Sequence, residues 1–172
     1  MTQIWDAIRM EFKELFTDEE EKIREMSRMA SAIVKEHYDP LLGAEQNDYM
    51  IRKFQSVEAI RDQLAHGYRY FFVREEDHNI GFMAFYPRGS AMYLSKFYLY
   101  KQERGKGFSR KMMAHVAEEA RKAGLASIEL NVNKYNSARY AYEKLGFQVI
   151  RAEKNDIGHG FFMDDYVYSL KV

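Results

Sequence analysis

The segment that most constrains the fold lies near the middle of the chain, where two extended stretches flank a helical one. Ala91–Tyr100 is rich in aromatic residues, as strands are. Ser109–Ala123 has apolar residues at helical spacing and ends at Gly124, and Ser127–Val132 alternates apolar and polar residues. This order predicts a crossover unit whose two strands lie side by side in parallel.

The segments around this crossover predict an otherwise antiparallel sheet. Strand-like composition recurs, between turns or helices, in these segments: Met10–Leu15, Tyr68–Arg74, Ile80–Tyr86, Phe147–Ile157 and Phe161–Leu170. A short helix is expected over Ser137–Leu145, ended by Gly146. The predicted fold class is therefore α/β (α+β), with a mixed, mostly antiparallel sheet of about six or seven strands and helices on both faces.

The first third of the chain is expected to be helical. Thr17 and Glu20 have the spacing of a capping box, which predicts a helix that begins there and ends near His37, before Pro40. Its apolar positions share one face and are expected in the core: Ile23, Met26, Ala30, Ile33 and Val34. Two more helices are expected after it, Glu45–Phe54 and one that is capped by Ser56 and closed by Gly67.

Composition excludes several classes of protein. The 172 residues suit a single domain spanning 1–172, and 26 basic against 26 acidic residues leave no global attraction to nucleic acid or an anionic membrane. The absence of cysteine removes disulfides, thiol nucleophiles and zinc–thiolate sites. No signal peptide and no apolar run of about 18 residues is present, so a cytoplasmic protein is expected.

The segment Arg104-Gly105-Lys106-Gly107-Phe108-Ser109 carries the clearest chemical signal, because it lies between the predicted strand and helix of the crossover. Two glycines let the backbone turn its N–H groups outward, and the first turn of the helix adds unpaired N–H groups and a partial positive charge. These features favour a phosphate site with Lys106 and Arg110 at its rim. A plain glycine-containing connection with solvated basic residues is the alternative. The spacing fits neither a P-loop nor a dinucleotide fingerprint.

Two motifs in this half of the chain resemble those of a known superfamily. The run Phe97–Met113 resembles motif A of the GNAT superfamily of acyl-CoA-dependent N-acetyltransferases, with the pattern Q/R-x-x-G-x-G/A. Arg104 takes its first position and Gly107 its fourth, while Ser109 stands where Gly or Ala is usual. Tyr142–Phe147 matches Tyr-Glu-Lys-x-Gly-Phe, the end of the superfamily's motif B.

The resemblance implies acetyl-CoA as co-substrate, with no metal. The strand before motif A, splayed from its parallel neighbour, would bind the pantetheine arm through its main chain, and Tyr142 would give a proton to the departing thiolate. The residues implied in cofactor binding are Phe97, Tyr98, Leu99, Arg104, Gly105, Lys106, Gly107, Phe108, Ser109, Arg110, Asn136 and Lys144.

The acceptor and the general base are less defined by the motifs. Some relatives place a glutamate base where this chain has Asn131, so a water chain is the leading expectation, with Glu129 or His37 as remote candidates. The acceptor residues expected are His37, Tyr38 and Asn131, and the acceptor is expected to be a small primary amine, with a polyamine as one hypothesis. Acetylation of a protein or peptide amine, a catalytically silent acyl-CoA-binding module and RNA binding are the alternatives. The chain is expected to be a monomer or a homodimer.

Overall fold

The computed structural model describes residues 10–172, which group into two compact units. Unit 1 comprises residues 10–85 of the described chain together with Lys96–Ser109, and unit 2 comprises Tyr86–Ser95 and Arg110–Val172. The unit boundaries fall within two strands and one helix, β3, β4 and α4, each of which contributes to both units. The expectation of one domain over residues 1–172 stays a prediction.

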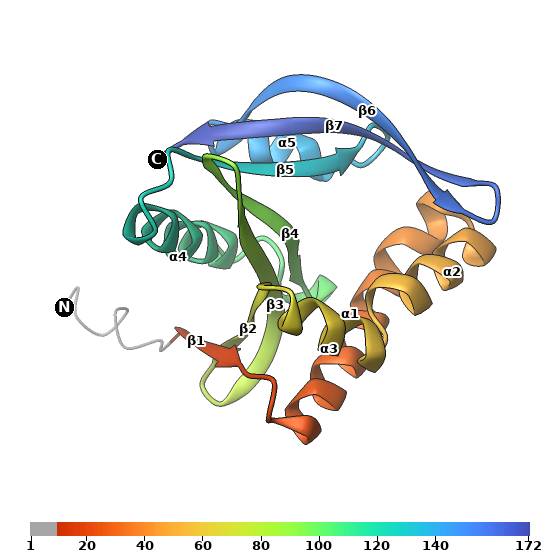
Figure 1. Cartoon of the computed structure of the whole chain (residues 1–172), viewed down its shortest axis with the longest axis horizontal. Coiled ribbons are helices and arrows are strands. Elements are labelled where there is room, and N and C mark those ends of the chain that lie inside the picture. Colours follow the sequence, from red (N-terminus) through yellow and green to blue (C-terminus); the bar gives the residue numbers. More distant parts are fainter. Residues whose placement is uncertain (1–9) are drawn as a thin grey trace. The chain divides into compact units, whose positions relative to one another are not determined.

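Figure 1 shows the elements in chain order. Unit 1 contains β1 (Met10–Leu15), α1 (Glu20–Leu42), α2 (Ala44–Phe54), α3 (Val57–Ala65), β2 (Arg69–Glu75) and a 3₁₀ turn, Lys101–Glu103. The elements shared between the units are β3 (His78–Arg88), β4 (Ala91–Leu99) and α4 (Phe108–Lys122). Unit 2 contains β5 (Ser127–Asn133), α5 (Ala138–Lys144), β6 (Gln148–Gly158) and β7 (Phe161–Lys171).

The strands form a seven-stranded sheet in the order β1-β2-β3-β4-β5-β7-β6. Strands β4 and β5 pair in parallel, from Ala91 opposite Ser127 to Tyr93 opposite Glu129. The β1–β2, β2–β3, β5–β7 and β6–β7 pairs are antiparallel. The predicted α/β class, with one parallel pair in a mostly antiparallel sheet, is confirmed. Within the described residues, no helix is long and apolar enough to cross a bilayer.

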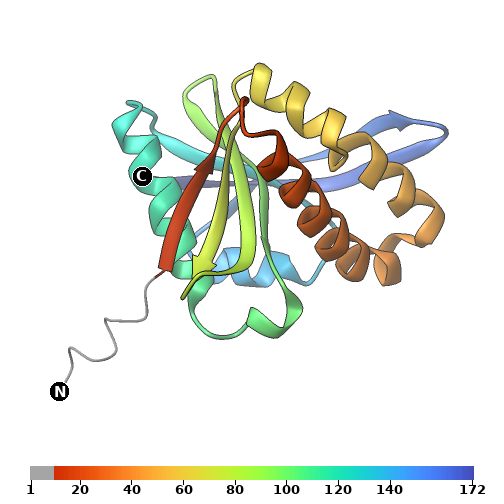
Figure 2. The same cartoon turned by 90° about the horizontal axis from the view of Figure 1, so that it is seen from below.

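The core of unit 1 lies between its helices and strands β1 to β3. The side chains of Ile23, Met26, Ala30 and Ile33 of α1 are buried there, as their spacing predicts. They pack with Ile60 of α3 and with aromatic residues of the strands, and Figure 2 shows α1 running beside the strands. The third helix begins as predicted, because Ser56 Oγ accepts a hydrogen bond from Ala59 N at 3.1 Å.

The ends of α1 differ from the prediction. No capping box forms: Glu19 is the N-cap residue, and its carboxylate accepts from Phe16 N at 2.9 Å. The helix also continues through Pro40 to Leu42. Proline in the last turn removes only one intrahelical hydrogen bond, and Gly43 N still donates to Asp39 O at 3.0 Å. An end near His37 is therefore wrong.

A close approach of two backbones fixes β4 against β3 inside unit 1. A Cβ added to Gly81 would overlap the carbonyl oxygen of Tyr98 and lie 3.1 Å from Leu99 Cα. The neighbouring bond runs from Tyr100 N to Ile80 O at 2.9 Å. Only glycine lets the two strands come this close here.

Replacing Gly81 by alanine is expected to lower the free energy of unfolding by about 1–3 kcal/mol, because the new methyl group must push the Tyr98–Leu99 backbone aside. The control is Gly89→Ala, which has open space but a φ of 61°, and should cost about 1 kcal/mol through local strain alone. Urea unfolding of the two variants measures the difference. A smaller loss at Gly81 than at Gly89 would contradict the close approach.

Candidate active site

The glycine-containing turn in unit 1 has the geometry of an anion site. It follows the 3₁₀ turn and leads directly into α4, which begins at Phe108. Gly105 and Gly107 have φ angles of 77° and 84°, in the left-handed region that favours glycine, and a Cβ at either position would meet no atom within 4 Å. The backbone can therefore come close to a ligand here, beside the first turn of a helix whose N–H groups lack intrahelical partners.

Two side chains fix this turn to the rest of unit 1. The Arg104 guanidinium donates to Leu99 O through Nε at 3.3 Å and through Nη2 at 3.2 Å, which joins the turn to the end of β4. Phe108 is buried at the start of α4. Lys106 is exposed and pairs with Glu103 at 3.2 Å, so its ammonium stays at the surface of the turn. Arg104 therefore helps to hold the turn in place against the end of β4.

The expected cofactor strand and two expected acceptor residues meet in unit 1. The Tyr98 ring stacks on Phe82, with centroids 5.3 Å apart. The rings of His37 and Tyr38 each lie edge-on to Tyr98 at 6.4 Å. The side chain of Tyr98 is thus held in an aromatic cluster, which leaves its main chain as the part that a ligand along β4 would contact. Phe97 is half-buried and Leu99 is buried.

Motif B closes the helix α5 in unit 2. Gly146 has a φ of 101°, Phe147 N donates to Tyr142 O at 3.1 Å, and Gly146 N donates to Glu143 O at 3.0 Å. These bonds are a Schellman motif, which explains why glycine and a hydrophobic residue follow this helix. The buried Phe147 ring packs edge-on against the half-buried Tyr142 ring at 5.7 Å. The Tyr142 ring is therefore anchored at the end of α5.

The other expected residues of unit 2 have different surroundings. Asn136 is buried, and its Oδ1 accepts from Ala138 N at 2.9 Å, so its amide helps to start α5. Lys144 and Arg110 are exposed. Glu129, a remote base candidate, pairs with Arg88 at 3.5 Å.

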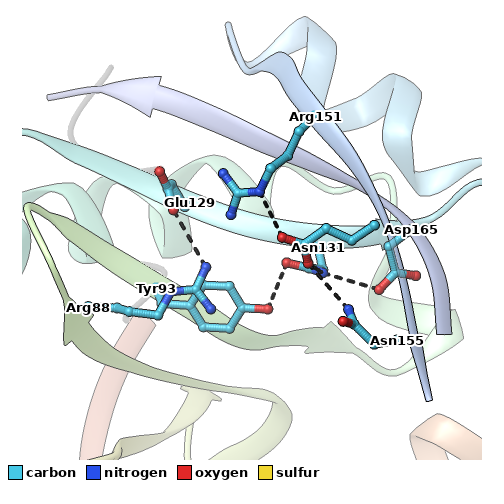
Figure 3. A network of polar contacts seen from close by, with 8 residues as sticks. Arg88, Tyr93, Glu129, Asn131, Arg151, Asn155 and Asp165 are labelled. Atoms are coloured by element: carbon cyan, nitrogen blue, oxygen red, sulfur yellow. Dashed lines mark hydrogen bonds and ion pairs between the residues drawn. The ribbon is translucent and has the colours of Figure 1, made fainter. Parts of the chain in front are cut away.

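Asn131 lies at the centre of a polar network that joins β4, β5, β6 and β7 through residues of unit 2 (Figure 3). Its Oδ1 accepts from Tyr93 Oη at 2.9 Å, and its Nδ2 donates to Glu153 and to Asp165, each at 3.3 Å. Arg151 Nε donates to Glu153 at 2.7 Å. Sequence reasoning found Asn131 by its place in the motif but missed the carboxylates, which come from strands far along the chain.

The surroundings of this network shift the pKa values of three of its side chains. Burial raises the pKa of Tyr93 to about 12, so its hydroxyl keeps its proton and can donate. The hydrogen bond from Arg151 lowers the pKa of Glu153. Burial raises the pKa of Asp165, which is 2% exposed.

A buried lysine in unit 1 was also missed from the sequence. Lys96 on β4 is 5% exposed, and its Nζ donates to Phe54 O at 2.5 Å, Gln55 Oε1 at 2.9 Å and Gln63 Oε1 at 3.0 Å. It also contacts the hydroxyl of Tyr70, which donates to Gln63 at 2.5 Å. All these partners are uncharged, and burial lowers the pKa of Lys96 to about 7. No sequence pattern distinguishes this lysine from a solvated one.

Comparison with known proteins identifies the family. The family model described as the acetyltransferase (GNAT) domain matches residues 33–163, so the chain belongs to the GNAT acetyltransferase family and is an acyltransferase enzyme. No curated protein matches the chain. The predicted superfamily is confirmed.

Solved structures with the same fold have low sequence identity to this chain. The PaiA N-acetyltransferase from Thermoplasma acidophilum, solved in complex with coenzyme A, is 20% identical with a TM-score of 0.75, and the match covers 96% of this chain and 100% of that one. A GCN5-related N-acetyltransferase from Rhodopseudomonas palustris is 12% identical with a TM-score of 0.77 and 96% coverage of both chains. A GNAT acetyltransferase from Elizabethkingia anophelis with acetyl-CoA bound is 16% identical with a TM-score of 0.57, covering 68% of this chain and 84% of that one.

Lys96 predicts a specific pH dependence of stability. Its pKa is about 7 in the folded protein and near the usual 10.5 in the unfolded chain, so the unfolded chain binds more protons between these values. Stability should therefore rise with pH above about 7. Relative to Lys96→Met, the wild type should gain on the order of 2 kcal/mol in free energy of unfolding from pH 7 to pH 9.

Urea unfolding at several pH values measures this gain. The control is Lys101→Met, which changes an exposed lysine in the 3₁₀ turn and should give a difference that does not vary with pH. The assignment fails if the difference between wild type and Lys96→Met is also constant from pH 7 to pH 9.

Proposed function

We propose that this enzyme transfers an acetyl group from acetyl-CoA to the primary amine of a small molecule by direct attack of the amine on the thioester. The observation that carries the proposal is the turn at Gly105 and Gly107. Both glycines have left-handed φ angles, and the turn directly precedes the N-terminus of α4. Two structures with this fold were solved with coenzyme A or acetyl-CoA bound, which supports the same co-substrate here.

In this proposal the pyrophosphate of the co-substrate lies on the backbone N–H groups of residues 105–110. Ser109 can add its hydroxyl, and Lys106, Arg110 and Lys144 supply positive charge from the surface. The main chain of Phe97, Tyr98 and Leu99 binds the pantetheine arm. Arg104 and Asn136 act mainly by holding the turn and α5 in place, since their side chains already bind the protein. Within residues 10–172, no group of three or more His, Asp or Glu residues is arranged to hold a metal ion.

The chemistry requires one proton to leave and one to arrive. The neutral amine nitrogen forms a bond to the thioester carbon, the carbon–sulfur bond breaks, and the thiolate takes a proton from the Tyr142 hydroxyl. An ordinary tyrosine pKa of about 10 lies above a thiol pKa of about 8.5, so this transfer needs a well-placed hydroxyl. The contact with Phe147 holds the ring for that role. The nitrogen gives up one proton to water as the amide forms, because Asn131 cannot act as a base. The Tyr142 phenolate regains its proton from water.

The acceptor is a small amine, with a polyamine as the first class to test, and His37, Tyr38 and Asn131 are its proposed contacts. The aromatic group of His37, Tyr38 and Tyr98 in unit 1 offers apolar faces to the carbon chain of such an amine. A cytoplasmic location and a monomeric or homodimeric state remain part of the proposal.

Ser109→Asp tests anion binding at the turn separately from the stability of α4. A carboxylate in the first turn of α4 should stabilise the helix by about 0.3–1 kcal/mol through its dipole, while repelling the pyrophosphate. We expect the Kd for coenzyme A to rise by about tenfold or more, while the Tm stays equal or rises. Ser90→Asp adds the same charge to the β3–β4 turn and should leave the Kd unchanged. Calorimetric titration with coenzyme A measures both, and unchanged affinity in Ser109→Asp would remove the turn from the site.

Tyr142→Phe tests the proton donor. It should lower kcat by about 100-fold or more without changing coenzyme A affinity, because the ring contact with Phe147 is kept and only the hydroxyl is lost. Tyr140→Phe, at an exposed position of the same helix, is the matched control and should keep full activity. Thiol release is measured with polyamines, amino acids, aminoglycosides and peptides. Equal activity in Tyr142→Phe would exclude this residue, and no turnover on any amine would count against the proposed reaction.

A further inference from the structure

The orientation of the Asn131 amide is decided by its neighbours. The hydrogen bond from Arg151 lowers the pKa of Glu153, and an ionised carboxylate only accepts hydrogen bonds, so the Nδ2 side of the Asn131 amide must face Glu153, at 3.3 Å. The same Nδ2 donates to Asp165 at 3.3 Å. The oxygen must then face the other way, where it accepts from the Tyr93 hydroxyl at 2.9 Å. Asn131 is half-buried, and a carbonyl oxygen can accept a second hydrogen bond. Its Oδ1 is thus a fixed acceptor with capacity for one more donor.

The charges of this network are not balanced. Arg88 pairs with Glu129 at 3.5 Å, and Arg151 pairs with Glu153 at 2.7 Å. Asp165 is more deeply buried than either of these glutamates, yet among residues 10–172 no lysine, arginine or histidine forms an ion pair with it. With Asp165 ionised, the network therefore carries one negative charge more than it has positive charges.

The remaining groups near Asp165 do not correct this imbalance. Asp164 and Glu153 are both acidic and raise its pKa further. Lys134 acts in the opposite direction, but its ammonium is paired with Asp164 at 3.0 Å. A buried charge without a counter-ion is costly in a medium of low dielectric, and a cation brought by a ligand would relieve that cost.

We propose that Asn131 recognises the acceptor amine as a positively charged ammonium group, and that Asp165 is the positioning residue that makes this recognition selective for cations. The ammonium donates a hydrogen bond to Asn131 Oδ1. Asp165 fixes the amide through its hydrogen bond, and the negative charge of its carboxylate attracts the ammonium electrostatically. Asp165 is only 2% exposed, so it acts through its hydrogen bond with the Asn131 amide and not by contact with the ligand. The inference rests on the proposed function, and it assigns to the acceptor a chemical class, an aliphatic amine that is charged at neutral pH.

The test compares two amines on the full chain saturated with coenzyme A. The dication 1,4-diaminobutane and p-anisidine, an aromatic amine that is neutral at pH 7, are titrated by calorimetry. In Asp165→Asn, which keeps the shape of the side chain and removes its charge, the Kd for 1,4-diaminobutane should rise by about tenfold and that for p-anisidine by less than about twofold. Glu129→Gln removes a charge of the same sign that already has a partner, Arg88, and should leave the preference for the cation unchanged.

A second variant distinguishes a loss of amine binding from a folding defect. Asn131→Ala removes the accepting oxygen at a half-buried position and should give the same selective loss, with a thermal unfolding curve recorded for each variant. Equal losses for both amines, or no loss for either, would overturn the role of Asp165. Failure of the wild type to bind 1,4-diaminobutane would overturn cation recognition. Tight coenzyme A binding and turnover of another amine class would in that case leave the proposed acetyl transfer intact.

Discussion

The parallel pairing of β4 with β5 is the constraint on which the other features of this fold depend. An antiparallel pair can be joined by a tight hairpin, but two parallel strands need a long crossover connection. The chain meets this need with α4, so a helix must begin shortly after β4 ends. The N-terminus of that helix, with its unpaired N–H groups, is therefore a consequence of topology. The two left-handed glycines then make its backbone accessible, and Arg104 ties the turn to the last carbonyl of β4.

Features that depend on local residues could be predicted from the sequence. Ser56 caps α3 through a neighbour three residues away, and Gly146 ends α5 through bonds that span a single turn. Alternation placed Ile128, Leu130 and Val132 in the core, and all three are buried. The same local reasoning was wrong at Pro40, because a proline in the last turn removes so little of a helix that α1 keeps its final residues.

Features that depend on distant residues could not be predicted. The carbonyl of Tyr98 makes glycine necessary at position 81, yet nothing near Gly81 in the sequence indicates how closely the backbone of strand β4 will approach it. Lys96 binds partners that are 26 to 42 residues away along the chain, and an isolated lysine in a strand reads as solvated. Asp165 reaches Asn131 from 34 residues away. In the candidate site, the motifs therefore identify the backbone elements and Tyr142, but not the carboxylates that surround Asn131.

Lys96 in unit 1 and Asp165 in unit 2 are both buried ionisable side chains, but their surroundings differ. Lys96 lies among neutral acceptors, and a neutral amine still has two N–H groups to donate to them, so loss of its proton removes the buried charge and keeps two of its hydrogen bonds. Asp165 differs, because among residues 10–172 its carboxylate accepts a hydrogen bond from Asn131 but forms no ion pair. Burial raises its pKa and favours the neutral carboxyl, while the hydrogen bond from Asn131 favours the carboxylate. Because these two effects oppose each other, protonation would remove the cost of burying the charge but would weaken the hydrogen bond from Asn131. A cation held at Asn131 would stabilise the charged form and keep the bond at full strength, which is the physical reason for the proposed role of Asp165 in binding a cationic acceptor.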